Sequence, residues 1–191
     1  MQGFSVLVIS DSHGNLPALT AALRWAVSRT GENTGGPPGL QPLTAAFFLG
    51  DGMEDLAAAS AETGFSLPWY CVRGNGDLDF SVPDALVPTM AGKTFFLSHG
   101  NRYHVETGCG ELAAAARSAG AEAALFGHTH VPFCARYGNL LLLNPGSIGR
   151  PRSRSGPSFA LLDCSGSGDR RILVRFFSPA DRGGAVRELR I

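Results

Sequence analysis

The chain has 191 residues and a mass of 20.0 kDa, and 44% of its residues are hydrophobic, which suits one globular domain spanning residues 1–191. Sixteen basic residues balance sixteen acidic ones, so the net charge gives no strong signal for nucleic-acid or membrane binding. No apolar run approaches the roughly 20 residues that span a bilayer, and the amino terminus lacks the features of a secretion signal. Four widely spaced cysteines form no metal-binding motif, and we expect a cytoplasmic protein with reduced thiols.

The first half of the chain predicts alternating strands and helices. Phe4–Ile9 is an apolar run typical of a strand buried on both faces. Asn15 and Pro17 are typical of a helix start, and apolar residues recur at helical spacing up to Arg29. After a Gly- and Pro-rich loop at Gly31–Pro42, the pattern predicts a strand at Ala45–Leu49, a helix at Met53–Glu62 and a strand at Leu67–Val72.

The second half contains more strands. A strand at Thr94–Leu97, a helix at Gly110–Ser118 and a strand at Ala121–Phe126 come first. Two antiparallel hairpins follow, at Phe133–Tyr137 with Leu140–Leu143 and at Ser158–Asp163 with Arg171–Phe177. The last residues, Asp181–Ile191, fit either a short strand or a tail. Together the two halves predict two sheets packed face to face with helices outside.

Side chains able to bind metal follow the predicted strands. They lie at five strand ends and comprise Asp11, His13, Asp51, Asn75, His99, His128 and His130. Taken singly, an aspartate after a strand is usually a cap or turn residue, and a lone histidine is usually a hydrogen-bonded polar side chain. However, four of the five histidines in the chain occupy such positions, and this coincidence favours a metal site at the carboxyl ends of the strands.

The donor types of these residues narrow the chemistry. Two carboxylates, four imidazoles and one carboxamide are too rich in nitrogen for calcium and lack the thiolates of structural zinc. Seven ligands exceed the needs of one ion but suit a pair, which activates water for in-line displacement at phosphorus. In an extended segment, His128 and His130 point to the same side, so each could bind a different ion.

The motifs Asp11-x-His13, Gly50-Asp51, Gly74-Asn75, His99-Gly100 and Gly127-His128-Thr129-His130 resemble, in this order, those of the calcineurin-like metallophosphoesterase family. The chain length and Asn144–Ser147 followed by Pro151-Arg152 are similar to its small bacterial and archaeal phosphodiesterase branch. The resemblance implies a four-layer α/β/β/α sandwich. It also implies that Asp51 bridges two ions, with Asp11, His13 and His130 on one ion and Asn75, His99 and His128 on the other.

Two positions depart from the family pattern. Gly76 stands where many members have a histidine thought to protonate the leaving group, and Asp77 could replace that histidine only with a raised pKa. Asn101 stands where relatives often have a second histidine, and we expect it to contact substrate. From Arg150 onward nine arginines outnumber four acidic residues, which fits either a solvated edge or an anion-binding site. We assign substrate binding to Asn75, Asn101 and Arg152.

These observations predict a phosphodiesterase in which a hydroxide bridging two divalent ions attacks a small phosphodiester substrate, with catalytic roles for Asp51, Asn75 and His99. Manganese is the expected metal, with nickel, iron or zinc as alternatives. The competing interpretation is a protein-interaction scaffold with the same fold, exemplified by a eukaryotic retromer subunit. Scaffold relatives tend to lose site histidines, whereas all seven expected ligands are present here. Formation of a homo-oligomer is left open by the sequence.

Overall fold

A computed structural model describes residues 3–30, 41–164, 171–179 and 186–191. The predicted loop at Gly31–Pro42 lies outside the described residues except for its last two positions. The predicted connection at 165–169 lies outside them as well.

The first sheet joins strands from both ends of the chain, in the order β12-β11-β10-β1-β2-β3. Strand β1 pairs in parallel with β2, which pairs in parallel with β3, while β10, β11 and β12 continue the sheet as antiparallel neighbours. Strand β1 is buried at all six positions, as expected for a strand covered on both faces. The strand bounds are β1 Phe4–Ile9, β2 Leu43–Phe48, β3 Trp69–Cys71, β10 Phe159–Cys164, β11 Ile172–Ser178 and β12 Arg187–Leu189.

The second sheet is built from the middle of the chain, in the order β4-β6-β7-β9-β8, and β5 also pairs with β6. Strands β6, β7 and β9 are parallel, whereas β8 and β9 form the predicted hairpin. The strand bounds are β4 Ala85–Leu86, β5 Thr89–Met90, β6 Lys93–Ser98, β7 Ala123–Leu125, β8 Pro132–Tyr137 and β9 Leu140–Pro145.

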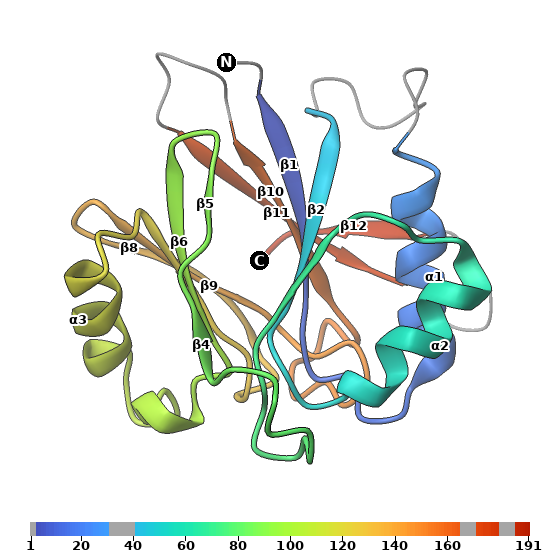
Figure 1. Cartoon of the computed structure of the whole chain (residues 1–191), viewed down its shortest axis with the longest axis horizontal. Coiled ribbons are helices and arrows are strands. Elements are labelled where there is room, and N and C mark those ends of the chain that lie inside the picture. Colours follow the sequence, from blue (N-terminus) through green and yellow to red (C-terminus); the bar gives the residue numbers. More distant parts are fainter. Residues whose placement is uncertain (1–2, 31–40, 165–170, 180–185) are drawn as a thin grey trace.

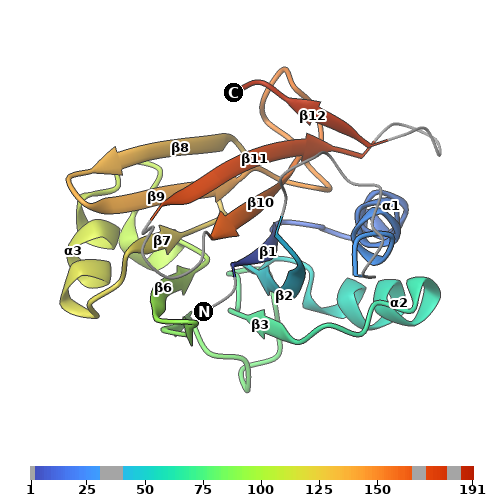
Figure 2. The ribbon, with the colours of Figure 1, turned by 90° about the horizontal axis from the view of Figure 1, so that it is seen from above.

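Helices cover the outer face of each sheet. Helices α1 (Leu16–Val27) and α2 (Met53–Thr63) lie beside the first sheet, and α3 (Gly110–Ser118) lies beside the second (Figures 1 and 2). The expected cap of α1 is present, since the Asn15 side chain accepts a hydrogen bond from the Ala18 amide. The predicted four-layer α/β/β/α sandwich is confirmed.

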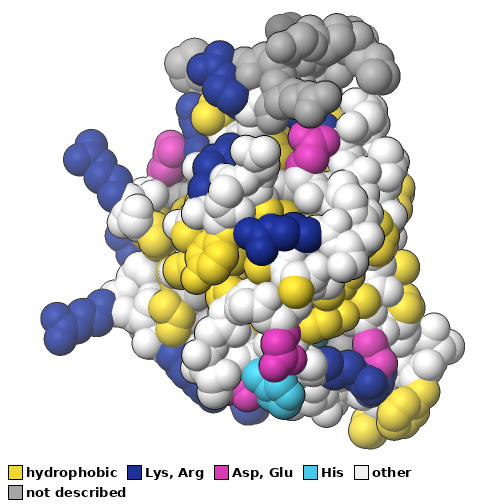
Figure 3. Space-filling view, turned by 90° about the vertical axis from the view of Figure 1, so that its left-hand side faces the viewer, with side chains coloured by type: hydrophobic (Ala, Val, Ile, Leu, Met, Phe, Trp, Pro, Cys, Tyr) yellow, Lys and Arg dark blue, Asp and Glu magenta, His cyan; other side chains and the backbone are white. Residues whose placement is uncertain are grey.

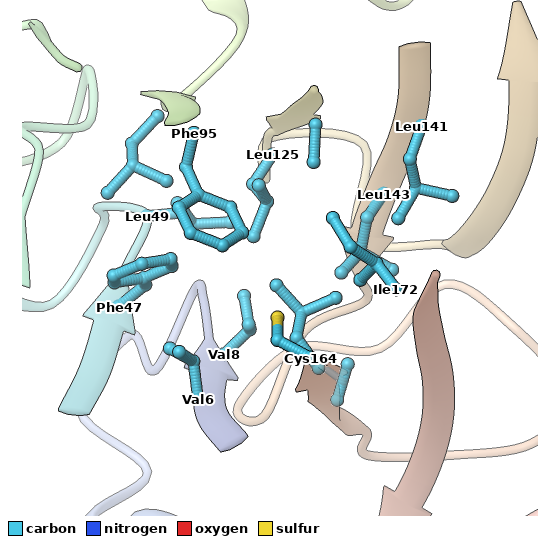
Figure 4. Close-up of a cluster of buried hydrophobic side chains, with 14 of the residues drawn as sticks. Val6, Val8, Phe47, Leu49, Phe95, Leu125, Leu141, Leu143, Cys164 and Ile172 are labelled. Carbon is cyan, nitrogen blue, oxygen red and sulfur yellow. The ribbon is translucent and has the colours of Figure 1, made fainter. Parts of the chain in front are cut away.

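The space between the sheets is filled by apolar side chains. Phe47 is fully buried, and its ring makes edge contacts with Tyr70 and Phe95, at centroid distances of 5.6 and 5.4 Å. Figure 4 shows Val6 and Val8 of β1 facing Leu125 and Leu143 of the other sheet across this layer. The packing of this layer fixes how the two sheets sit relative to each other.

The sequence missed two short strands. Strands β4 and β5 lie in and after the segment 77–88, which showed no alternation long enough to predict a strand. The ambiguous carboxyl-terminal segment contains a strand, because Arg187–Leu189 pairs with the end of β11.

The surface carries mixed charge. On the face over α3, hydrophobic side chains are bordered by basic and acidic ones (Figure 3), as the balanced charge of the chain predicts. Within the described ranges, none of the helices has the length and apolar character needed to cross a membrane.

We predict that Phe47→Ala lowers the free energy of unfolding by about 3–5 kcal/mol, because it leaves a cavity between the sheets. Urea denaturation followed by circular dichroism measures this change. Leu173→Ala is the control, since Leu173 is 54% exposed and its truncation should cost under about 0.5 kcal/mol. Equal losses in the two variants would contradict the role of this layer.

Candidate metal centre

Five of the predicted ligands converge where the strands end, at the bottom of Figure 1. Asp11 and His13 follow β1, Asp51 follows β2, His99 follows β6, and His130 precedes β8. Two groups of ligand atoms form, and within each group the atoms lie within 4.8 Å of one another. Asp11, His13 and His130 form one group, and Asp11, Asp51 and His99 form the other.

Asp11 belongs to both groups and is fully buried. Its Oδ2 accepts hydrogen bonds from the Ser10 hydroxyl and the His128 amide, at 2.5 and 3.2 Å. Its Oδ1 has no hydrogen-bond partner within the described part of the chain. Burial raises the pKa of Asp11, but the imidazoles of His13 and His130 outweigh this effect, and the pKa lies well below its usual range. The carboxylate is therefore ionised, and its Oδ1 is available to bind a cation.

Two histidines present a bare nitrogen to this cluster. His99 Nδ1 lies 2.7 Å from the Leu49 carbonyl oxygen, and His130 Nδ1 lies 2.7 Å from that of Arg150. A carbonyl only accepts, so both Nδ1 atoms are donors, which leaves Nε2 free as a ligand in the neutral rings. His99 Nε2 is buried and is unpartnered among the described residues.

The spacing of these atoms fits a bound cation. His130 Nε2 lies 3.1 Å from Asp11 Oδ1 and 3.2 Å from His13 Nε2. Lone pairs this close repel each other unless a proton or a metal ion lies among them. The Asp11 carboxylate favours a proton on His130 and therefore raises the pKa of His130. The donor set, carboxylate oxygens with imidazole nitrogens, is suitable for a divalent transition metal.

Asp51 belongs to the second group and also lies near His13 of the first. Its Oδ2 is 3.7 Å from His13 Nε2 and 3.6 Å from His99 Nε2, while its Oδ1 accepts the Gly76 amide at 2.7 Å. The distances place one carboxylate oxygen of Asp51 near a ligand from each group. This position is compatible with the bridging role implied by the family resemblance.

The backbone is strained at the cluster. Seven non-glycine residues in the described ranges have positive φ, and five of them, with φ between 44° and 65°, are Asp11, His13, Asp51, His128 and His130. This conformation costs about 1 kcal/mol or more per residue. Such strain is typical of functional sites, and nothing in the sequence except adjacent glycines signals it.

Residues from the second sheet support the cluster. The Ser147 hydroxyl donates to the Asp11 carbonyl at 2.8 Å, and the Asn144 side chain donates to the Gly127 carbonyl and the Thr129 hydroxyl. Gly127 is required here because a Cβ atom would collide with the Ser10 hydroxyl. The turn at 144–147 therefore supports the site.

Asn75 and His128 lie beside the two groups rather than in them. Both line a hollow of about 440 Å³, which we call the arginine hollow. Its other lining residues are His13, Asp51, His130, Arg150, Pro151 and Arg152. His128 Nε2 faces Glu106 Oε2 at 3.7 Å, and its ring lies 5.2 Å from that of His99. Burial and the neighbouring His99 lower the pKa of His128, which favours the neutral, ligating form.

Of the predicted substrate contacts, Asn75 and Arg152 thus share one hollow with the cluster. Asn101 instead begins the 3₁₀ turn at Asn101–Tyr103, and it does not line this hollow. Its contact with substrate stays a prediction.

Comparison with known proteins identifies the family. The sequence profile of the calcineurin-like phosphoesterase superfamily domain matches residues 4–167. The chain belongs to this superfamily. A curated member, the probable metallophosphoesterase YsnB of Bacillus subtilis, is 29% identical over 122 residues, which are 64% of this chain and 69% of that protein.

Solved structures share the phosphoesterase fold. A predicted phosphoesterase from Streptococcus pneumoniae has a TM-score of 0.73 and 24% identity, covering 99% of this chain and 98% of its own. An archaeal phosphodiesterase has a TM-score of 0.65 and 18% identity, and the match covers 89% of this chain and 98% of the phosphodiesterase. Vps29 of Entamoeba histolytica, solved with zinc, has a TM-score of 0.67 and 21% identity, covering 98% of both chains. At these identities the structures show the fold alone.

Asp77, which could replace the missing histidine only with a raised pKa, has a different role. Its carboxylate accepts hydrogen bonds from the backbone amides of Asp51, Gly52, Met53 and Gly74, at 2.8–3.0 Å. Burial raises the pKa of Asp77, but these four donors outweigh it and lower the pKa below its ordinary value. Asp77 is therefore an ionised structural anchor that joins the loops after β2 and β3, and it lacks the raised pKa that a proton donor at this position would need.

We predict that Gly127→Ala weakens Mn²⁺ binding by about 10–100-fold, because its methyl group displaces Ser10 and the Asp11 carboxylate. Isothermal titration calorimetry measures the affinity. Gly110→Ala is the matched control, since a Cβ atom there meets nothing within 4 Å. Unchanged affinity in Gly127→Ala would contradict the assignment of Asp11 as a ligand.

We predict that Asp77→Asn destabilises the fold by about 1–3 kcal/mol at neutral pH, because a neutral amide is a weaker acceptor for four amides. The folded-state pKa of Asp77 is depressed, so its stabilisation exists above the unfolded pKa and is lost as pH falls through the folded pKa. Urea unfolding of both proteins across acidic pH should show the difference shrinking. An equally stable variant that loses activity on substrates with poor leaving groups would instead indicate that Asp77 protonates the leaving group.

Proposed function

We propose that the protein is a metal-dependent phosphodiesterase acting on small phosphodiesters. The observation that carries this proposal is the pair of buried atoms Asp11 Oδ1 and His99 Nε2, which have no hydrogen-bond partner among the described residues. They belong to ligand groups whose other members, His13, Asp51 and His130, line a hollow that also contains two arginines. A buried bare carboxylate oxygen and a bare imidazole nitrogen favour a divalent cation. Arginines beside such a site are suited to a phosphate group.

The surroundings of the cluster favour a diester over a monoester. A second hollow of about 370 Å³ shares His13 and Asp51 with the arginine hollow and extends to Gly76 and Leu78. We call it the leucine hollow. Open space therefore exists on two sides of the cluster, enough to receive the two ester groups of a diester.

We assign the following roles to the residues of the site. Asp11, His13, Asp51, His99 and His130 would hold metal, with Asn75 and His128 completing a two-ion centre. Bound ions supply an activated water and stabilise negative charge on the phosphate. Arg150 and Arg152 orient the anionic phosphate oxygens. Asp77 is unsuited to protonate a leaving group, so we expect faster turnover of diesters with good leaving groups than of alkyl esters.

Manganese is our proposed metal, with nickel, iron or zinc as alternatives. A mixture of carboxylate and imidazole donors suits all four, and metal availability decides among them. We also propose that the protein works in the cytoplasm, given its four free cysteines.

The alternative function is an interaction scaffold, which the structural likeness to Vps29 keeps open. Against it stands the strained backbone at the ligands, because a site without chemistry gains nothing from five residues at positive φ. The enzyme is therefore our preferred function.

The test compares His13→Ala with His104→Ala. Both histidines have positive φ, at 44° and 49°, but only His13 belongs to the cluster. We predict that His13→Ala lowers kcat/KM for bis(p-nitrophenyl) phosphate about 100-fold or more with Mn²⁺ present, and that His104→Ala retains activity. Initial rates of diester hydrolysis measure this loss. The same rates with p-nitrophenyl phosphate give the activity on a monoester, and reactions with a chelator give the metal-free blank.

Two results would contradict the proposal. The first is a folded wild-type protein that binds Mn²⁺ yet cleaves no diester, which would favour the scaffold. The second is equal loss of activity in both histidine variants.

A further inference from the structure

The two hollows on either side of the cluster differ in charge. The arginine hollow contains Arg150 and Arg152, whereas no lysine or arginine among the described residues lines the leucine hollow. Besides Asp51, four carboxylates line the leucine hollow, from Glu54, Asp55, Asp77 and Asp79. A substrate bound across the cluster therefore meets positive charge on one side and negative charge on the other.

Local hydrogen bonds hold three of these carboxylates in place. Asp55 accepts the Ser12 hydroxyl and the Gly14 amide, and Asp79 accepts the Ser81 amide and hydroxyl. Asp77 is fixed by its four amides. The remaining one, Glu54, is exposed in the first turn of α2. The negative charge of the hollow is therefore built into its walls.

The leucine hollow also has an apolar side. Leu78, which is 79% exposed, and Met53 line it, and Gly76 brings no side chain into it. An exposed leucine beside a phosphoester site offers contact to an apolar or aromatic group. The hollow therefore combines apolar contact with negative charge.

We propose that the leucine hollow receives one ester group of the diester and sets its class. It favours an uncharged or cationic group, preferably aromatic or apolar, over one with a further phosphate or carboxylate. Leu78 contributes the contact, and Glu54 and Asp79 repel a second anion. This inference rests on the proposed function.

The experiment uses two symmetric diesters of similar shape, bis(4-carbamoylphenyl) phosphate and bis(4-carboxyphenyl) phosphate. Because both ester groups are the same, one must enter the leucine hollow whichever group leaves. The measured quantity is the ratio of kcat/KM for the carboxylate diester to that for the amide diester, with saturating Mn²⁺.

Glu54→Gln should raise this ratio roughly fivefold, because one repulsive charge is removed. Asp79→Asn should act in the same direction while keeping an oxygen to accept from Ser81. The matched control is Glu111→Gln, since Glu111 also lies exposed in the first turn of a helix, but on α3. Its ratio should equal that of the wild type.

The apolar contact is tested separately with Leu78→Ser. It should lower kcat/KM for the amide diester severalfold, whereas Leu173→Ser, at an exposed leucine on β11, should leave it unchanged.

The outcomes separate this inference from the proposed function. A ratio that rises in Glu54→Gln and Asp79→Asn but not in Glu111→Gln supports the inference. Cleavage of both diesters with the same ratio in every variant overturns the inference and leaves the phosphodiesterase in place. Cleavage of neither diester by the Mn²⁺-loaded wild type overturns the proposed function and this inference with it.

Discussion

The carboxylate of Asp11 is fully buried, and an ionised group in a protein interior is destabilising unless it is paired. Ser10 and the His128 amide satisfy one of its oxygens, and the other faces the Nε2 atoms of His13 and His130. The surrounding structure follows from this arrangement. Two carbonyl groups orient the His99 and His130 rings, so that one ring presents its free nitrogen to each of the two ligand groups that include Asp11.

The cluster depends on the packing of the two sheets, because each sheet supplies only part of it. Asp11 and Asp51 follow strands of the first sheet, whereas His99 follows a strand of the second. The apolar layer around Phe47 holds these strand ends in register, and the hydrogen bond from Ser147 to the Asp11 carbonyl links the two sheets at the site. A well-packed core can therefore support a strained site, since the favourable burial between the sheets offsets the cost of the left-handed residues.

The sequence predicted the long elements and singled out the side chains that gather at the strand ends, because both leave strong local signals. The apolar run at Phe4–Ile9 and the capped helix after Asn15 match β1 and α1 closely. Strands β4 and β5 are two residues each, too short for alternation to reveal them. The role of Asp77 depends on four amides that the fold brings together from two loops, and residue type alone does not distinguish this anchor from a proton donor.

The arginine-rich end of the chain shows how position decides the role of a charge. Arg175 pairs with Glu188 at 3.8 Å, and Arg187 donates to the Ser155 carbonyl, so both take part in local contacts of the first sheet. Arg150 and Arg152 instead line the hollow beside the cluster, because the turn after β9 crosses the ends of the parallel strands. Of the arginines in this local excess of positive charge, the topology thus brings Arg150 and Arg152 to the strand ends beside the cluster.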